Sequence, residues 1–207
     1  MVIPFLSLTW ITAAEALALG YLFGSVPFGL LFSYVLGAGD VRKIGSGSIG
    51  ATNVLRTGNY AAAGLTLLFD ALKGAAAVLI VRALWGADAG LFAALGAFLG
   101  HLYPVWLGFK GGKGIAVSLG ILLALYWPVG LLSFASWGVV LAMFRISSLS
   151  ALVAAIVTPV YMVLFHLPHE AVLAVLLAVL VFVAHQANIG RLLRGEEPHV
   201  GAKAKPA

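Results

Sequence analysis

GSGSIGATNVLR, residues 45–56, is a polar loop between two long apolar segments. Its small residues let backbone N–H groups pack closely, and the loop adds hydroxyls, an amide and an arginine, a combination that suits a phosphate group. The candidate binding residues are Gly45, Ser46, Gly47, Ser48, Thr52, Asn53 and Arg56. The alternative is a flexible Gly/Ser linker, and the loop is not a Walker A sequence because no Gly-Lys-Ser/Thr follows the glycines.

The apolar segments around this loop place the chain in a membrane. The 207 residues are 62% hydrophobic and 9% charged, and the mean hydropathy is +1.09. We therefore predict an all-α integral membrane protein that forms one polytopic domain over residues 1–207. The absence of cysteine excludes disulfides and thiolate chemistry. The net charge of +5 comes from short loops beside apolar segments, which indicates topology signals and anionic-lipid contacts, not nucleic-acid binding.

Hydropathy predicts seven transmembrane spans, each about as long as a bilayer crossing or slightly shorter. They cover residues 10–36, 60–84, 90–107, 115–128, 129–144, 149–165 and 170–190. The fourth and fifth are short and share a turn at Pro128, so they can also be read as one broken helix. In the first span, Gly20 and Gly24 lie four residues apart, a spacing that permits close helix packing.

The distribution of basic residues predicts the orientation. With seven spans, one side of the membrane receives Arg42, Lys43, Arg56, Lys110, Lys113, Arg145, Arg191, Arg194, Lys203 and Lys205. Only Arg82 lies near the opposite face, and Lys73 lies within the second span. The positive-inside rule makes the crowded side cytoplasmic, so the N-terminus is expected outside and the C-terminus inside.

A second glycine-rich loop, FKGGKG at 109–114, has the same character and offers Lys110, Gly111, Gly112 and Lys113 as phosphate ligands. Its glycines would let backbone amides approach an anion, and Lys113 opens the fourth span, where a helix N-terminus adds partial positive charge. The alternative is a positive-inside tag without a binding role.

The seventh span contains HQANIGR at 185–191, in which His185 and Asn188 share one helical face. Histidine suits proton transfer near neutral pH and asparagine can orient or polarise an oxygen, although a lone interfacial histidine is the alternative. Asp70 and Lys73 are interpreted as an intrahelical pair, and His101 receives no assigned role. Because no His/Asp/Glu group has metal-ligand spacing, we predict no metal and no cofactor.

GSGSIGATNVLR, FKGGKG and HQANIGRLLRGEE, in this order on apolar spans, resemble the acyl-phosphate-dependent glycerol-3-phosphate acyltransferases of bacteria, the PlsY family. GSVPFG in the first span and FDALKG in the second add to the resemblance. It implies that acyl phosphate and glycerol 3-phosphate react to give 1-acylglycerol 3-phosphate (lysophosphatidate) and phosphate, in the first acylation of phospholipid synthesis. It also implies a multi-pass protein of the bacterial inner membrane with a cytoplasmic active site, and no acyl-CoA or acyl carrier protein as donor.

The family's functional positions correspond to Ser46, Thr52, Asn53, Arg56, Gly111, Gly112, Lys113, His185 and Asn188, and Ser48 departs from the asparagine that many members carry. Arg56 and Lys113 suit the phosphates, and Ser46 and Asn188 suit orientation or oxyanion support. The base is either His185 or a phosphate oxygen of a substrate. A competing function is a small transporter for a phosphorylated solute, but we find no internal repeat, and the polar motifs gather at one face.

Overall fold

The structure is a computed structural model that describes residues 8–201, and its regular secondary structure in that range is entirely helical. The helices are α1 (Trp10–Gly24), α2 (Phe28–Val35), α3 (Ala51–Leu55), α4 (Tyr60–Trp85), α5 (Ala87–Leu102), α6 (Ile115–Phe144), α7 (Ser147–Leu164), α8 (Pro168–Ala184) and α9 (Gln186–Leu193), with short 3-10 turns η1 (Val41–Lys43) and η2 (Val105–Leu107). The prediction of an all-α fold is therefore confirmed for the described residues. Lys203 and Lys205, which entered the topology argument, lie outside them.

Long apolar helices make this a multi-pass membrane protein. The segments long and apolar enough to cross a bilayer are Trp10–Val35, Tyr60–Trp85, Ala87–Leu107, Ile115–Phe144 and Ser147–Leu164, and the bent pair α8–α9 supplies a sixth. Their outer faces expose large apolar side chains such as Leu68, Ile80 and Val139. Such surfaces are stable in contact with lipid acyl chains.

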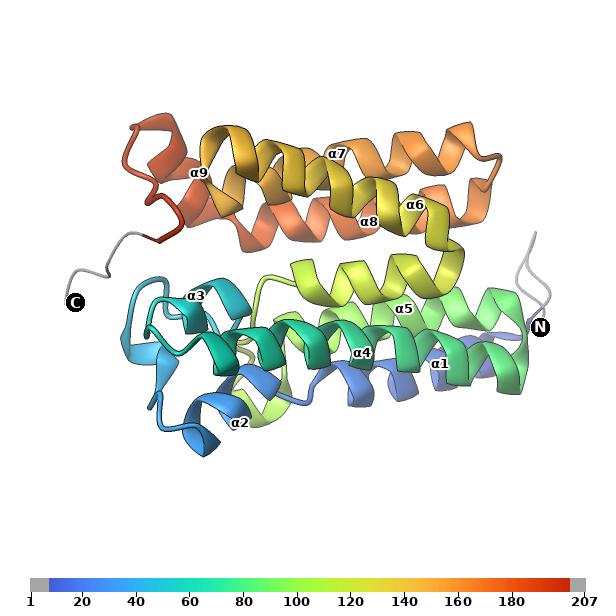
Figure 1. The fold of residues 1–207 in the computed structure, drawn as a ribbon. Coiled ribbons are helices and arrows are strands. Elements are labelled where there is room, and N and C mark those ends of the chain that lie inside the picture. The colour runs from blue at the N-terminus through green and yellow to red at the C-terminus, as the bar shows by residue number, and fades with distance from the viewer. Residues whose placement is uncertain (1–7, 202–207) are drawn as a thin grey trace.

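Helix α6 covers both the fourth and the fifth predicted spans. Its backbone leaves the helical conformation at Tyr126, where φ is −156° and ψ is 96°. Pro128 follows closely and has no N–H with which to continue the helical hydrogen bonds of the first half. Figure 1 shows that the chain reverses at this break, so the two halves of α6 run antiparallel toward the same end of the bundle.

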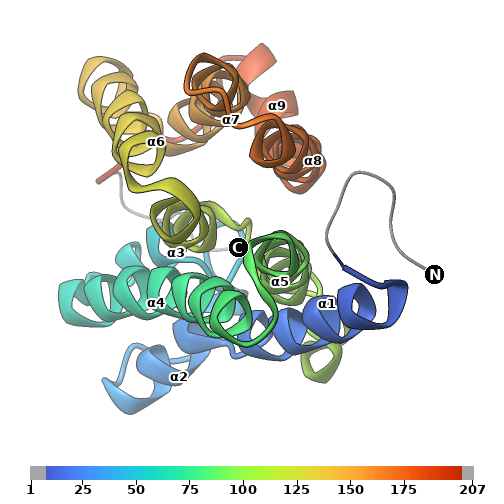
Figure 2. The same ribbon diagram turned by 90° about the vertical axis from the view of Figure 1, so that its right-hand side faces the viewer.

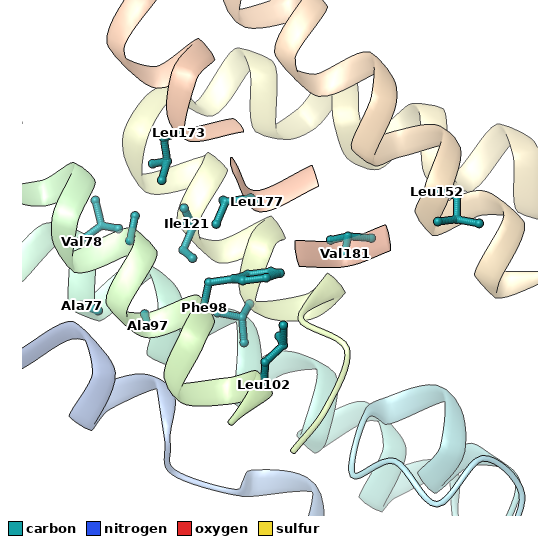
Figure 3. Packing of buried hydrophobic residues seen from close by; sticks show 12 residues of the cluster. Ala77, Val78, Ala97, Phe98, Leu102, Ile121, Leu152, Leu173, Leu177 and Val181 are labelled. Carbon is teal, nitrogen blue, oxygen red and sulfur yellow. The ribbon is translucent and has the colours of Figure 1, made fainter. Parts of the chain in front are cut away.

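The two halves of α6 belong to different layers of the bundle. Viewed along the bundle, Figure 2 shows α1, α4, α5 and the first half of α6 on one side, and the second half of α6 with α7 and α8 on the other. The larger apolar core joins the layers, and Figure 3 shows the Phe98 ring of α5 beside Ile121 of α6 and Leu177 and Val181 of α8. This core anchors the start of α6, where the second glycine-rich loop ends.

Helices α1 and α5 are in backbone contact, as the glycine spacing in the first span predicted. A side chain on Gly20 would overlap the backbone of Ala93, and one on Gly24 would overlap the backbone of Ala97. The missing side chains allow this approach, which is the usual role of small residues between membrane helices.

The first predicted span is broken between α1 and α2 at Pro27. A break inside a membrane helix exposes carbonyl groups that need partners where water is scarce. Here the carbonyl oxygen of Val26 accepts from Lys73 Nζ at 2.7 Å, and that of Ser25 accepts from Trp106 Nε1 at 2.7 Å. Side chains of α4 and η2 therefore supply the hydrogen-bond donors that these two carbonyl groups need.

The predicted polar loops gather at one end of the bundle. In Figure 1 this end holds η1, α3, α9 and the turn between α6 and α7. The opposite end holds the beginning of α1, the turn from α4 to α5 and the turn from α7 to α8. The motifs that are distant in sequence can therefore form one site.

Candidate active site

A cavity of about 630 Å³ lies at the end of the bundle that holds α3 and α9. Among the predicted site residues, it is lined by Ser46, Ser48, Thr52, Asn53, Arg56, Lys113, His185 and Asn188. The structure thus brings residues of all three sequence motifs to one hollow. Its lining also includes Asp70, His101, Ser147, Ser148 and Glu197, to which the sequence alone assigned no part in the site.

Asn53 organises the first loop from within. Its Nδ2 donates to the carbonyl oxygens of Val41 and Ser48 at 2.8 Å each, and its Oδ1 accepts from the Ser46 backbone N–H at 3.0 Å. The side chain is buried, with 3% of its surface exposed. Because its amide is occupied by the loop backbone, Asn53 shapes the loop, and the neighbouring side chains are left to meet a ligand.

Arg56 is the half-buried cation of this loop. Its Nη1 lies 3.4 Å from Asn53 Oδ1, and within residues 8–201 no carboxylate forms an ion pair with its guanidinium. Burial lowers the pKa of Arg56, with smaller effects from the charges of Glu197 and Arg191. A partly desolvated guanidinium without a carboxylate partner is well suited to an anionic ligand.

Lys113 stands directly before α6 and points toward α9. Its Nζ donates to Asn188 Oδ1 at 2.5 Å. Burial lowers the pKa of Lys113 to about 8; the nearby Glu197 opposes this shift, and Arg191 and Arg56 add to it. Arg56 and Lys113 therefore give the cavity two partly desolvated cations.

The second loop does not offer the backbone cradle that its glycines suggested. The N–H of Gly111 donates to the carbonyl oxygen of Leu102 and that of Gly112 to the carbonyl oxygen of His101, both at 3.0 Å. These hydrogen bonds fasten the loop to the end of α5 and occupy the N–H groups. Lys110 is exposed and does not line the cavity, so Lys113 is the one candidate ligand of this loop that faces the site.

Two glycines of the first loop, Gly45 and Gly47, also stay outside the cavity lining. Gly45 and Gly47 have positive φ values of 53° and 68° and do not line the cavity. A side chain on Gly45 would overlap Asn53 and Arg56, so glycine at this position lets both side chains take their places. Ser48 Oγ accepts from the Gly50 backbone N–H at 3.2 Å and steadies the turn into α3.

His185 occupies the bend of 65° between α8 and α9. It is buried, and its Nδ1 lies 2.8 Å from the carbonyl oxygen of Val181. A carbonyl oxygen can only accept, so Nδ1 carries a proton and a neutral ring keeps its lone pair on Nε2. Because His185 lines the cavity, this tautomer can accept a proton from a bound hydroxyl.

Glu197 is the main site residue that sequence reasoning missed. Its Oε1 accepts from Asn188 Nδ2 at 2.5 Å and from Ser148 Oγ at 2.7 Å, and its Oε2 accepts from Arg191 Nε at 2.6 Å. Burial alone would raise the pKa of Glu197, but these three hydrogen bonds outweigh it and lower the pKa. In the sequence, Glu197 follows a helix end among other charges and reads as a solvated residue.

Ser147 is a further residue that the sequence did not single out. Its Oγ lies 3.3 Å from Thr52 Oγ1, so a hydroxyl pair joins the first loop to the start of α7. The neighbouring Ser148 points instead to Glu197. The start of α7 therefore contacts both the first motif and the third.

Comparison with known proteins shows strong similarity to membrane acyltransferases. The sequence profile described as glycerol-3-phosphate acyltransferase matches residues 14–195. A glycerol-3-phosphate acyltransferase of Mesorhizobium japonicum is 56% identical over 188 residues, which cover 91% of this chain and 96% of the relative. One of Cereibacter sphaeroides is 60% identical over 185 residues, which cover 89% of this chain and 92% of the relative.

Two solved structures have the same fold. They are crystal structures of PlsY (YgiH), an integral membrane glycerol 3-phosphate acyltransferase. The glycerol 3-phosphate form has a TM-score of 0.86 and 35% identity, covering 91% of this chain and 96% of that chain. The lysophosphatidic acid form has a TM-score of 0.82 and 33% identity, covering 90% of this chain and 94% of that chain.

Fold and site define this protein as an integral membrane acyltransferase. More particularly, the chain belongs to the glycerol-3-phosphate acyltransferase family.

The pKa of Lys113 predicts an alkaline limit to activity. With a pKa of about 8, the ammonium is present below pH 8 and is lost as the pH rises further. We expect kcat/KM to fall above about pH 8, by about tenfold per pH unit, because the substrate phosphates are already fully ionised there while Lys113 loses its charge. The measurement is kcat/KM between pH 6 and 10 at constant ionic strength. Lys113→Arg keeps its charge throughout this range, so its profile should stay flat above pH 8 at a lower overall level. If the kcat/KM of Lys113→Arg also fell above pH 8, the fall would be due to a group other than Lys113.

Substitution of Arg56 tests whether its planar guanidinium matters. If it donates two parallel hydrogen bonds to a phosphate, lysine cannot replace it, because an ammonium is a point donor. Arg56→Lys should keep the fold and lose activity by roughly ten- to a hundredfold, the equivalent of about 1.5–3 kcal/mol. The matched control is Arg42→Lys, since Arg42 is exposed and pairs with Asp40 outside the cavity. Initial rates of folded protein are compared, and near wild-type kinetics for Arg56→Lys would reduce the first loop to a linker.

Proposed function

We propose that this protein transfers the acyl group of acyl phosphate to glycerol 3-phosphate, giving 1-acylglycerol 3-phosphate and inorganic phosphate. In this reaction a glycerol hydroxyl attacks the acyl carbonyl carbon, the bond from that carbon to the phosphate oxygen breaks, and the hydroxyl proton leaves. The acceptor is supported by relatives that are named glycerol-3-phosphate acyltransferases and by the glycerol 3-phosphate and lysophosphatidic acid forms of PlsY. The reaction begins bacterial phospholipid synthesis.

One observation carries the proposal: the polar cavity meets an apolar one. A second cavity of about 150 Å³ lies among α4, α6, α7 and α8, with a lining that includes Leu119, Leu122 and Leu177. The two cavities share Leu67, Ile115, Ala116, Trp137 and Ala151 in their linings. An acyl phosphate has the same division, so its chain suits the apolar cavity and its head suits the end with Arg56 and Lys113.

The site residues then have separate roles in the proposed reaction. Arg56 and Lys113 bind the two phosphates and stabilise the charge that develops on the departing one. His185 Nε2 faces the reacting hydroxyl as proton acceptor, with a phosphate oxygen of a substrate as the other candidate base. Ser46 lines the same cavity and supplies a hydroxyl for orientation or oxyanion support.

Asn188 acts by orienting Lys113. Its amide oxygen receives the lysine ammonium while its amide nitrogen is held by Glu197. An acyl phosphate is already activated, because phosphate is a good leaving group. Alignment of two anionic reactants in a partly desolvated site is therefore the main catalytic contribution that we assign to the protein, without an acyl-enzyme.

We further propose seven membrane crossings in one polytopic domain, with the N-terminus outside and the C-terminus in the cytoplasm. The count treats the two halves of α6 as separate crossings, in line with the reversal at Tyr126 seen in Figure 1. The gathering of the basic loops at one end supports a cytoplasmic active site in the bacterial inner membrane. The membrane lipid is then both the solvent of the donor chain and the destination of the product.

The proposed function predicts a strict choice of donor. Purified protein given acyl phosphate and glycerol 3-phosphate should form lysophosphatidate, and acyl-CoA as sole donor should give little or none. The reason is that the polar lining is suited to small phosphates, with no feature that we recognise as a nucleotide or carrier-protein site. Product is followed by mass spectrometry, with Arg56→Lys protein as the control for contaminating enzymes. Robust turnover with acyl-CoA would contradict the donor assignment.

The proposed topology predicts which single cysteines react from each side. The chain has no cysteine of its own, so each introduced one is read without background. Cysteines at the exposed positions Lys43, Lys110 and Gly195 should react with a membrane-impermeant maleimide only from the cytoplasmic side, and those at Ala87 and Pro168 only from outside. Right-side-out vesicles expose the outer face to the reagent, and inverted vesicles expose the cytoplasmic face. Labelling of positions 110 and 87 from the same face would contradict seven crossings.

A further inference from the structure

Three ionisable side chains are buried together between α4 and the end of α5. Asp70, Lys73 and His101 expose 1%, 5% and 3% of their surface. Lys73 Nζ lies 2.7 Å from Asp70 Oδ1 and donates to the Val26 carbonyl oxygen at 2.7 Å. His101 Nδ1 faces the same Asp70 oxygen at 3.7 Å. Buried charges are costly unless they are paired, so this arrangement calls for a reason beyond the packing of α4.

The opposite edge of His101 supports the second loop. A methyl group on Gly112 would overlap Nε2, Cε1 and Cδ2 of the His101 ring, and the Gly112 N–H donates to the His101 carbonyl oxygen at 3.0 Å. The ring therefore lies against Gly112 on one side and against Asp70 on the other. Gly112 immediately precedes Lys113, the cation that reaches Asn188.

We propose that His101, packed between Asp70 and Gly112, is a positioning residue that sets the place of Lys113 in the phosphate site. The His101 ring acts through Gly112: it fixes how deeply the second loop lies on the end of α5, and so where the Lys113 ammonium stands. Asp70 closes the other side of the ring, and Asp70 is itself fixed by Lys73, which is bonded to the break between α1 and α2. This inference rests on the proposed function, since Lys113 is taken to bind the phosphate of one of the two substrates.

Two neighbouring glycines make the inference testable. A methyl group on Gly112 would meet the His101 side chain, whereas one on Gly111 would meet the carbonyl oxygens of His101 and Leu102, which are backbone. Shortening the side chain at position 101 therefore makes room beside Gly112 and none beside Gly111. His101→Asn is suited to this, because it keeps a polar group near Asp70 and removes the outer ring atoms.

The experiment is a double-mutant comparison with acyl phosphate and glycerol 3-phosphate. Gly112→Ala and Gly111→Ala should each lower kcat/KM by about tenfold or more, because small misplacements of a binding group are costly. Adding His101→Asn should raise the kcat/KM of Gly112→Ala by at least about threefold and leave that of Gly111→Ala unchanged. His101→Ala should give the same pattern. Gly138→Ala, a helical glycine with open space around it, is the control that should resemble wild type.

Varying each substrate at saturation of the other identifies the phosphate that Lys113 binds. The KM for that substrate, donor or acceptor, should rise in Gly112→Ala and fall back in the double variant. The inference is overturned if His101→Asn rescues neither glycine variant or both, or if only the amount of folded protein changes. Wild-type protein in the same assay separates a failure of the proposed function from a failure of this inference. If wild type forms no lysophosphatidate, the proposed function is overturned. If wild type is active but the rescue is not selective, only the role of His101 is overturned.

Discussion

The site depends on the side chain of Asn188, which joins a lysine to a carboxylate. One end of its amide accepts from Lys113 and the other donates to Glu197, at 2.5 Å in both cases. The amide has a fixed direction, so it separates the two charges while holding both. Through these contacts the loop before α6, the bend after α8 and the chain beyond α9 become one structure. Ser148 adds the start of α7 by its hydrogen bond to Glu197.

This arrangement explains how the cavity keeps positive charge for its ligands. A direct Lys113–Glu197 ion pair would neutralise the lysine, but Asn188 lies between them. Glu197 is satisfied by Arg191 and Ser148, and the guanidinium of Arg56 is left for an anion. Partial burial strengthens the interaction of Arg56 and Lys113 with a phosphate, because fewer water molecules compete for it.

The membrane part of the fold follows a related rule at its helix break, where the freed polar groups find partners on other elements. The break between α1 and α2 frees carbonyl groups, and these are met by Lys73 and Trp106 from other elements. Lys73 is in turn paired with Asp70, which faces His101. The interior polar groups thus connect the break in the first span to the edge of the active site.

The sequence by itself determined the all-α membrane class, the close packing at Gly20 and Gly24, and the three polar motifs, since each depends on local hydropathy, residue size or composition. It could not show that Asn53 turns inward to the loop backbone or that the Gly111 and Gly112 N–H groups bond to α5. Nor could it distinguish Glu197 from the exposed charges near it. Those outcomes required the tertiary structure, because they depend on which distant segments meet and which hydrogen-bond partners those segments bring.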